Sequence, residues 1–526
     1  MIYLDYAATT PLDPRVAQAM QDCLTAGPLL GNPAAVTHAP GRAAAARIQH
    51  ARGQLAALLG CEGREIVFTS GATESNNLAI LGAAQAGADR GRHIVTSRIE
   101  HKSVRDPCRH LEKQGWRISY VPPDRSGRID PHAVAGALRD DTVLVSLMHA
   151  NNETGVLNDI ESIGAACRAR GIPFHTDAAQ SAGRVPLDLA RLPVDFLSLT
   201  AHKLYGPAGV GALYVRRDAR QFLEPVSFGG GQEGGLRPGT LATHQIVGFG
   251  AACELAMAEA AADDARITAL RDELWRGIEV VGGAHLNGAG APRVANILNV
   301  SFEDVDGESL VTALGSIALS TGSACSSATG EPSYVLRALG RSERLAESSL
   351  RLSLGRFTTK AEIESATRQI VREVARLRSI SPQGSAASQP RDTPAGEDSS
   401  AGRLQDLSPA VRRLFLELPG AGALEDAAGI VLRGEAGGPL EECWVRFHLA
   451  IVGESVKDAR FQARGCPHTL AAAAWLTREL CGRRRDAALP GTPAQWAQTL
   501  GVPAEKLGRL LVVEDALRSC LQRGPA

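Results

Sequence analysis

Short runs rich in β-branched and aromatic residues alternate with longer helical stretches over residues 1 to about 378. The runs that we expect as buried strands are "REIVFTS" (64–70), "HIVTS" (93–97), "TVLVSLMH" (142–149), "PFHTDAA" (173–179) and "DFLSLT" (195–200), and the intervening helices include 40–59 and 159–170. Strands that alternate with helices predict an α/β fold with a parallel sheet covered on both faces. Ligands gather at the carboxyl ends of such strands, so the polar motifs that follow them are the first candidates for a site.

The composition changes near Ser379. The segment "SISPQGSAASQPRDTPAGEDSSAG" is rich in Ser, Pro, Gly and Ala, which predicts a flexible linker over 379–404. An ordered pattern then resumes: "CWVRFHLAIVG" and "DARFQARG" read as strands, and "CPHTLAAAAWLTREL" as a helix with Pro467 in its first turn. We therefore expect a second, α+β domain over 405–526, as the length of 526 residues also indicates.

Charge and cysteine usage narrow the class of protein. The chain has 56 basic and 57 acidic residues, which argues against a nucleic-acid or anionic membrane surface. Neither a secretory leader nor a bilayer-spanning apolar run is expected from the sequence. Ten cysteines are scattered without a CxxC pair, which favours reduced thiols over a disulfide framework. We expect a cytoplasmic protein.

One lysine lies in an unusual setting. Lys203, within "SLTAHKLYGPAGVGALYV", follows an expected strand and precedes a glycine-rich turn, and Asp177 ends the strand before it. Considered separately, Lys203 fits a solvated loop residue and Asp177 fits a helix cap. Together they suit pyridoxal phosphate, whose aldehyde binds an amine and whose pyridine nitrogen needs a carboxylate. Gln180 is then placed to hydrogen-bond the phenolic oxygen of the ring.

A cofactor phosphate also needs a binding site. "SGATESNN" (70–77) follows a strand and opens a helix, whose backbone N–H groups suit an anion. Thr200 and His202 beside the lysine add donors. His101, in "RIEHKSV", is either a packed histidine or a residue that stacks on the cofactor ring and moves protons.

Two further segments carry candidate residues. In "STGSACSSATG" (320–330), Cys325 is either a small buried cysteine or a thiol on a mobile, accessible loop. In "SLRLSLGRF" (349–357), Arg351 is expected just after a strand, where its guanidinium either clamps an α-carboxylate or forms a surface salt bridge.

Ten motifs occur in an order that resembles one family. They are "YLDYAATTP", "GNPAAVTH", "TSGATESNN", "EHKSV", "MHANNETGV", "HTDAAQS", "AHKLYGPAGVGALYV", "GGGQEGGLRPGT", "STGSACSSA" and "LRLSLGRFTT". Over about residues 1–370 they resemble the NifS/IscS-type cysteine desulfurases of the class V aminotransferase group. The resemblance implies a homodimeric, pyridoxal-phosphate-dependent transferase fold over 1–378, with a large domain (about 16–255) and a small domain (about 1–15 and 256–378).

The resemblance also implies roles at the cofactor. Lys203 is similar to the lysine that binds the cofactor aldehyde, Asp177 to the partner of the ring nitrogen, Gln180 to the phenolic-oxygen contact and His101 to the stacking histidine. Asn152, in "NNETG", is similar to a residue that touches cofactor or substrate. The residues similar to phosphate ligands are Ala72, Thr73, Thr200 and His202, with Thr240 of "RPGT" reaching the neighbouring subunit's site.

For the substrate, the resemblance implies conversion of L-cysteine to L-alanine. Arg351 is similar to the carboxylate clamp and Cys325 to the nucleophile that becomes a persulfide, on a loop similar to the longer, mobile form found in one family branch. The sulfur would serve iron–sulfur cluster assembly or other thio-cofactors, through acceptor or scaffold proteins. A selenocysteine lyase shares the same cofactor site, so this alternative stays open.

The second domain resembles the IscU/NifU-type iron–sulfur scaffold over about 405–525, through "ESVKDARFQARGCPHTLAAAAWLTREL" and "LLVVEDALRSCL". That family uses three cysteines, of which only Cys466 matches in place. Glu441 and Cys443 stand near the first position, "LGRLL" occupies the third, and Cys520 lies beyond it. The loss of two of the three cysteine positions argues against a bound cluster, because iron–sulfur clusters are held by a full set of thiolate ligands.

Cys466 precedes a helix, where the helix dipole is expected to lower the thiol pKa. Three alternatives stay open for this domain: Cys466 accepts sulfur from Cys325, the domain scaffolds a cluster with Cys466 as a ligand, or it offers only a contact surface. No other metal site is expected.

Overall fold

The computed structural model describes residues 1–25, 31–321, 332–380, 404, 406–424, 429–438 and 443–522. Its largest sheet has seven strands in the order β2–β8–β7–β6–β5–β3–β4. These strands are β2 (Ile66–Thr69), β3 (His93–Ser97), β4 (Arg117–Val121), β5 (Thr142–Ser146), β6 (Phe174–Asp177), β7 (Phe196–Thr200) and β8 (Gly211–Val215). All five expected strands are confirmed.

The expectation of a wholly parallel sheet is wrong at one strand. Strands β4, β3, β5, β6 and β7 pair in parallel, whereas β8 pairs antiparallel with both β7 and β2. The connection explains the reversal: β7 ends at Thr200 and β8 begins at Gly211, which leaves too little chain for the crossover that a parallel partner requires.

Helices cover both faces of this sheet, as expected. Ile48 of α2 (Ala39–Leu59) and Ile163 of α6 (Ile160–Ala169) belong to one apolar cluster. Leu78 of α3 (Ala72–Gly87) and Val104 of α4 (Lys102–Lys113) belong to another. Burial on both faces accounts for the continuous apolar character of the strands.

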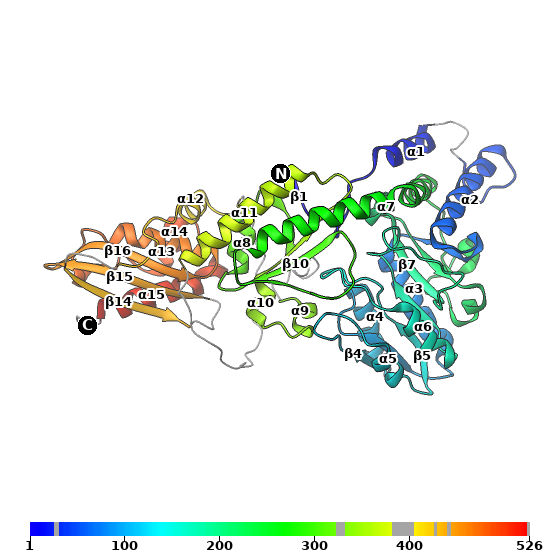
Figure 1. Cartoon of the computed structure of the whole chain (residues 1–526), viewed down its shortest axis with the longest axis horizontal. Coiled ribbons are helices and arrows are strands. Elements are labelled where there is room, and N and C mark those ends of the chain that lie inside the picture. Colours follow the sequence, from blue (N-terminus) through cyan, green and yellow to red (C-terminus); the bar gives the residue numbers. More distant parts are fainter. Residues whose placement is uncertain are drawn as a thin grey trace.

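A second sheet, with the order β12–β13–β10–β9, is antiparallel throughout. Its strands are β9 (Ala284–Leu286), β10 (Ile297–Phe302), β12 (Ser320–Thr321) and β13 (Ser349–Ser353), and its helices include α8 (Gly307–Ala313) and α11 (Lys360–Ser379). Strand β1 (Ile2–Tyr3) pairs with β11 (Ile317–Ala318), which brings the N-terminal segment to this region. The long helix α7 (Thr243–Glu279) joins the two sheets (Figure 1). The expected boundary between the large and small domains, at residues 255–256, falls within this helix.

The C-terminal region is an α+β domain at one end of the molecule (Figure 1). Its antiparallel sheet comprises β14 (Ile430–Gly437), β15 (Trp444–Val452) and β16 (Ser455–Arg464), and its helices are α12 (Pro409–Glu417), α13 (Pro467–Leu480), α14 (Pro493–Leu500) and α15 (Leu507–Gln522). The predicted strands β15 and β16 and helix α13 are confirmed, and β14 was missed. No helix in the described ranges is long and apolar enough to cross a membrane.

This domain is docked on the region of the second sheet. Leu310 of α8, Val374 of α11 and Phe415 of α12 belong to one continuous apolar cluster. The Ala463 N–H donates to the Ile380 carbonyl at 2.6 Å, and Ser309 Oγ donates to the Gly465 carbonyl at 2.7 Å. The two parts therefore share a core rather than merely a covalent link.

Candidate active site

A cavity of about 410 Å³ opens at the carboxyl ends of β6 and β7 and at the start of α3. Its size is that of a small-molecule site. The sequence-predicted residues that line it are Ala72, Thr73, His101, Asn152, Asp177, Gln180, Thr200, His202, Lys203 and Arg351. Thr240 is exposed and does not line this cavity, and Cys325 lies outside the described residues.

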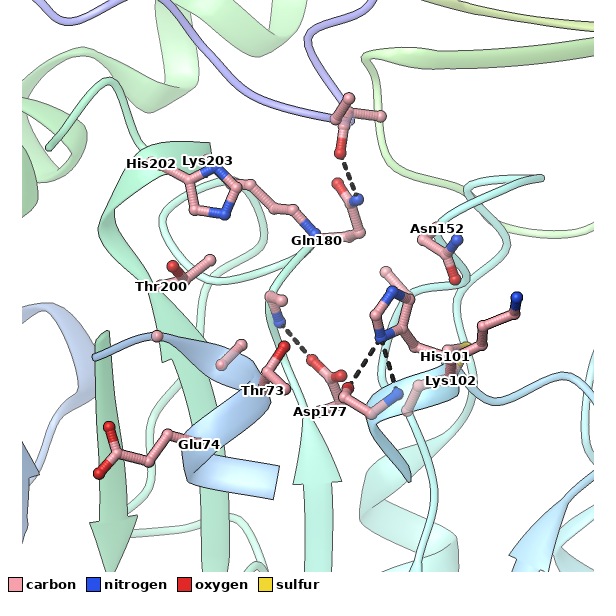
Figure 2. Close-up of a pocket in the computed structure, with 18 of the residues that line it drawn as sticks. Thr73, Glu74, His101, Lys102, Asn152, Asp177, Gln180, Thr200, His202 and Lys203 are labelled. Carbon is pink, nitrogen blue, oxygen red and sulfur yellow. Dashed lines mark hydrogen bonds between the residues drawn. The ribbon is translucent and has the colours of Figure 1, made fainter. Parts of the chain in front are cut away.

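Lys203 is positioned by a short 3₁₀ turn, η3 (Ala201–Lys203), directly after β7. The Lys203 carbonyl accepts a hydrogen bond from Arg184 at 3.0 Å, and the His202 carbonyl accepts one from the Thr10 N–H at 2.8 Å. Figure 2 shows the Lys203 amine reaching into the middle of the site, whereas Lys102, which also lines the cavity, points away. The turn therefore holds one amine toward the centre.

Asp177, the last residue of β6, is held through both carboxylate oxygens. Asn76 Nδ2 donates to Oδ2 at 2.7 Å, and the Ala179 N–H donates to Oδ1 at 2.9 Å. These bonds fix the carboxylate at the base of the cavity (Figure 2). Sequence reasoning missed Asn76, although it lies four residues after Ala72 and thus on the same face of α3.

The same asparagine connects Asp177 to His101. Asn76 Nδ2 also donates to Ser103 Oγ at 2.8 Å, and this hydroxyl lies 2.8 Å from His101 Nδ1, which accepts the Ser103 N–H at 3.1 Å. A backbone N–H can only donate, so Nδ1 is an acceptor and a neutral ring carries its proton on Nε2. Burial, followed by the charge of Lys203, lowers the pKa of His101 and favours this neutral form.

The start of α3 provides an anion site at the other end of the cavity. Ala72 and Thr73 begin the helix, so their N–H groups have no acceptor within it. Thr200 and His202 line the same end, and burial, followed by the charge of Lys203, lowers the pKa of His202 to about 4. A Cβ at Gly211 would lie 2.6 Å from the Gly71 Cα, so only glycine permits β8 to approach this turn.

Several side chains that line the cavity have a buried polar atom without a partner, among them Gln180 and Asn152. Gln180 Nε2 donates to the Ala7 carbonyl at 2.9 Å, but its Oε1 has no partner, and neither does Asn152 Oδ1. An unpaired buried polar group costs roughly 1–3 kcal/mol, so these atoms indicate a missing polar ligand. The anion site, the fixed carboxylate and the central lysine amine fit pyridoxal phosphate.

Arg351 differs from its sequence interpretation in two respects. It is the central residue of β13 rather than a residue after a strand, because the alternation "SLRLS" continues on both sides of it. Its side chain is only 2% exposed, so the surface salt bridge is wrong. Nη2 donates to Asp5 at 2.9 Å and to Ser320 Oγ at 3.1 Å, and Nη1 donates to the Asn152 carbonyl at 3.0 Å.

Two buried carboxyl groups near the site were missed by sequence reasoning. Burial raises the pKa of Glu153, which lines the cavity, to about 8, and Ser333 Oγ donates to it. Burial likewise raises the pKa of Glu100 to about 8, although the Met148 N–H and Ser97 Oγ donate to it. Only the packing of distant segments over "NNETG" and "RIEHKSV" buries these groups, so no local pattern marks them.

The fold and this arrangement define a pyridoxal-phosphate-dependent enzyme of the aminotransferase type. Residues 2–365 match the family described as Aminotransferase class-V, and residues 411–523 match the NifU-like N terminal domain. The chain is 55% identical over 381 residues to "Cysteine desulfurase IscS" of Shewanella baltica, which covers 72% of this chain and 94% of that protein. The chain therefore belongs to the class V aminotransferase family, within which it is a cysteine desulfurase of the IscS type with a NifU-like domain.

Solved structures agree with this assignment. The protein titled "SspA in complex with cysteine" is 38% identical, with a TM-score of 0.62 over 68% of this chain and 100% of that one. DndA from Streptomyces lividans is 42% identical, with a TM-score of 0.58 over 67% of this chain and 99% of that one. A cysteine desulfurase from Thermococcus onnurineus NA1, at 22% identity and a TM-score of 0.63 over 71% of this chain and 94% of that one, supports the fold alone.

The thiol of Cys466 lies in the NifU-like domain, at the N-cap of α13 as expected. The expectation of a lowered pKa is wrong: burial raises the pKa of Cys466, because its side chain is covered and only 3% of the residue is exposed. Cys466 Sγ and Cys443 Sγ lie 3.5 and 3.7 Å from the same Thr469 hydroxyl. Burial also raises the pKa of Cys443, to about 11.

A third thiolate is not supplied here by the described residues. Cys520 lies on α15, and its Sγ contacts the Phe447 carbonyl at 3.7 Å. Glu441 lies outside the described ranges. Two neighbouring thiols do not make the three-cysteine set of the scaffold family, so these residues do not fit that way of binding a cluster.

Proposed function

We propose that this cysteine desulfurase converts L-cysteine to L-alanine and leaves the sulfur as a persulfide on Cys325, for use in iron–sulfur cluster assembly or in other thio-cofactors. The observation that carries the proposal is the cavity itself, where Lys203 and Asp177 meet an anion site and Arg351. The similarity to IscS and to a relative whose title names cysteine supports this substrate.

When bound, pyridoxal phosphate supplies an aldehyde and an electron-accepting ring. Lys203 Nζ would bind that aldehyde and is the group placed to move the substrate Cα proton. Asp177, fixed by Asn76, holds a proton on the ring nitrogen. His101 holds a proton on Nε2, since its Nδ1 is occupied by Ser103, and Arg351 orients the substrate carboxylate.

The sulfur step uses Cys325 as a thiolate. An S–S bond forms between Cys325 Sγ and the substrate sulfur while the substrate Cβ–S bond breaks. The electron pair of the broken bond stays on Cβ, and a proton converts Cβ to the methyl group of alanine. Thiolate attack of this kind is a typical route for sulfur transfer.

The assembly and location are also part of the proposal. We place the chain in a homodimer, in which Thr240 binds the phosphate of the neighbouring site; its exposure on this protomer supports that role. A cytoplasmic location is supported by the described cysteines, which form no disulfide with one another.

The NifU-like domain acts as the tethered partner in sulfur delivery. Tethering gives an effective concentration of about millimolar where the geometry permits contact. The burial of Cys466 favours a contact role in the docked arrangement, and acceptance of sulfur requires this thiol to become exposed.

The test is mass spectrometry of the holoprotein after turnover of L-cysteine. We expect an added sulfur on the Cys325 peptide and one alanine per sulfur released, with Cys325→Ala abolishing both the adduct and desulfuration of cysteine. Full desulfuration by Cys325→Ala would contradict the nucleophile. A selenocysteine lyase would instead turn over selenocysteine and leave cysteine nearly untouched.

A further inference from the structure

The docked interface brings together three side chains of the kinds that bind transition metals. They are Glu308 from α8, and Cys466 and His468 from the start of α13, and their ligand atoms all lie within 4.8 Å of one another. Cys466 and His468 belong to the NifU-like domain, whereas Glu308 belongs to the desulfurase part of the chain. Neither part alone contains the set.

Backbone contacts beside these residues fix the two helix starts. Asp306 caps α8 by accepting the Ser309 N–H at 2.8 Å, and Ser309 Oγ donates to the Gly465 carbonyl at 2.7 Å. Ser309 follows Glu308 and Gly465 precedes Cys466, so each link is next to a candidate ligand. The three side chains are therefore placed by rigid elements rather than by loops.

We propose that Glu308, Cys466 and His468 bind one divalent transition-metal ion, for which Zn²⁺ is the best match, between the desulfurase and its NifU-like domain. A thiolate, an imidazole and a carboxylate are all Zn²⁺ ligands, and three of them leave a fourth tetrahedral position for water. Zn²⁺ bonds to such atoms are about 2.0–2.3 Å long, so small side-chain rotations bring atoms now within 4.8 Å of one another around one ion.

Two of the candidate ligands are buried, and the third, Glu308, forms an ion pair that a metal ion must displace. Cys466 and His468 are 3% and 6% exposed, so few water molecules compete for the ion. Glu308 now pairs with Lys506 at 3.2 Å. Metal binding breaks the Cys466 S–H bond, forms a metal–sulfur bond and releases the proton to solvent, while Glu308 exchanges the Lys506 ammonium for the ion.

A metal in this position has a consequence for sulfur delivery. It clamps the NifU-like domain to α8 and occupies the Cys466 sulfur, so this thiol cannot accept a persulfide sulfur until the metal leaves. The binding itself does not depend on the proposed desulfuration, and its test measures metal affinity rather than turnover.

The experiment titrates full-length holoprotein with Zn²⁺ against a chromophoric chelator, and repeats it with Co²⁺ to detect the thiolate-to-metal absorption band. We expect one ion per chain. Cys466→Ser, His468→Gln and Glu308→Gln should each weaken Zn²⁺ binding by more than about 100-fold, beyond what loss of an outer-shell partner costs. Circular dichroism and cofactor absorbance check that each variant is folded.

Two further variants separate this site from its rivals. Cys443→Ser removes the neighbouring thiol that is not in the set, and Lys506→Met removes the competitor of the metal. Both are expected to bind Zn²⁺ at least as tightly as the parent. Absence of stoichiometric binding, unchanged affinity in Glu308→Gln, or loss of binding in Cys443→Ser or Lys506→Met would overturn the proposal.

Discussion

The cavity at the start of α3 and the site at the start of α13 share a strand-to-helix junction but differ in how much of that junction is buried. In each, a strand leads into a helix: β2 precedes α3, and β16 precedes α13. A cavity of about 410 Å³ lies at the start of α3, and buried atoms without a partner line it. Helix α8 packs over the start of α13, so Cys466 is closed off. What packs opposite a helix start thus decides whether the helix start borders an open cavity or a closed interface.

The largest predicted difference between the two sites is the effect on alanine formation of removing one reactive group from each. Lys203→Ala should lower alanine formation by at least about 10⁴-fold, because it deletes both the cofactor bond and the proton carrier. Cys466→Ala should change alanine formation less than about 2-fold, measured with a thiol reductant present to discharge the persulfide. A large loss in Cys466→Ala would place both groups in one catalytic path.

Acid should destabilise the desulfurase core around β5 and β6. Burial lowers the pKa of His149 and of His175 to about 4. A group whose folded pKa is lowered takes up a proton on unfolding, so its stabilisation is present above its unfolded pKa of about 6.5 and is lost as pH falls toward 4. As the pH falls from 7.5 to 5.5, each histidine should raise the equilibrium constant for opening of this region about 10-fold.

Hydrogen exchange of peptides from β5 and β6, corrected for the intrinsic pH dependence, measures this loss. Peptides from β10 and β13, which contain no histidine, provide the reference. Equal pH slopes in both sheets would contradict the assignment to His149 and His175.

Asn76 is expected to matter through Asp177 and His101 rather than through substrate contact. Asn76→Ala removes a hydrogen bond to a carboxylate worth about 1.5–3 kcal/mol, so kcat should fall about 10–100-fold. The acid limb of the pH–rate profile should also move, because the Ser103 hydroxyl, which lies 2.8 Å from His101 Nδ1, loses the Asn76 donor. Asn77→Ala is the matched control, since the bond that Asn77 makes to the described residues is to the Thr73 carbonyl of its own helix. An equal effect in this variant would contradict the role of Asn76.

The smallest expected effect concerns the docking of the NifU-like domain. Arg376 donates to the Phe415 carbonyl at 3.0 Å and stacks over the Phe415 ring at 5.1 Å. Losing these contacts should weaken docking by about 1 kcal/mol, so Arg376→Ala should speed alkylation of Cys466 by iodoacetamide about 5-fold without changing turnover.

Arg372→Ala provides the control, because Arg372 also pairs with Glu373 but is mostly exposed. Equal alkylation rates in the two variants would show that this contact does not govern access to Cys466.

The sequence was enough to predict five strands of the main sheet and ten of the residues that line the cavity, because strand ends, helix starts and ligand chemistry are local features. The direction of β8 also follows from the sequence once the short connection after Thr200 is counted. The roles assigned to these residues rest on the family resemblance as well as on this geometry.

What sequence could not predict depends on packing between distant segments. Asn76 and Ser103 lie 27 residues apart and meet only when α3 and α4 pack together. The pKa of Cys466 is raised because α8, more than 150 residues earlier in the chain, covers it, and this burial outweighs the helix start. Glu308 likewise becomes a candidate ligand only through docking.

The most direct test of the account is borohydride reduction of the purified holoprotein followed by peptide mapping. Lys203 is the amine that the structure directs into the cavity, so a single pyridoxyl group should be found on the peptide that contains it. A pyridoxyl group on Lys102, or a protein that carries none, would contradict the central claim.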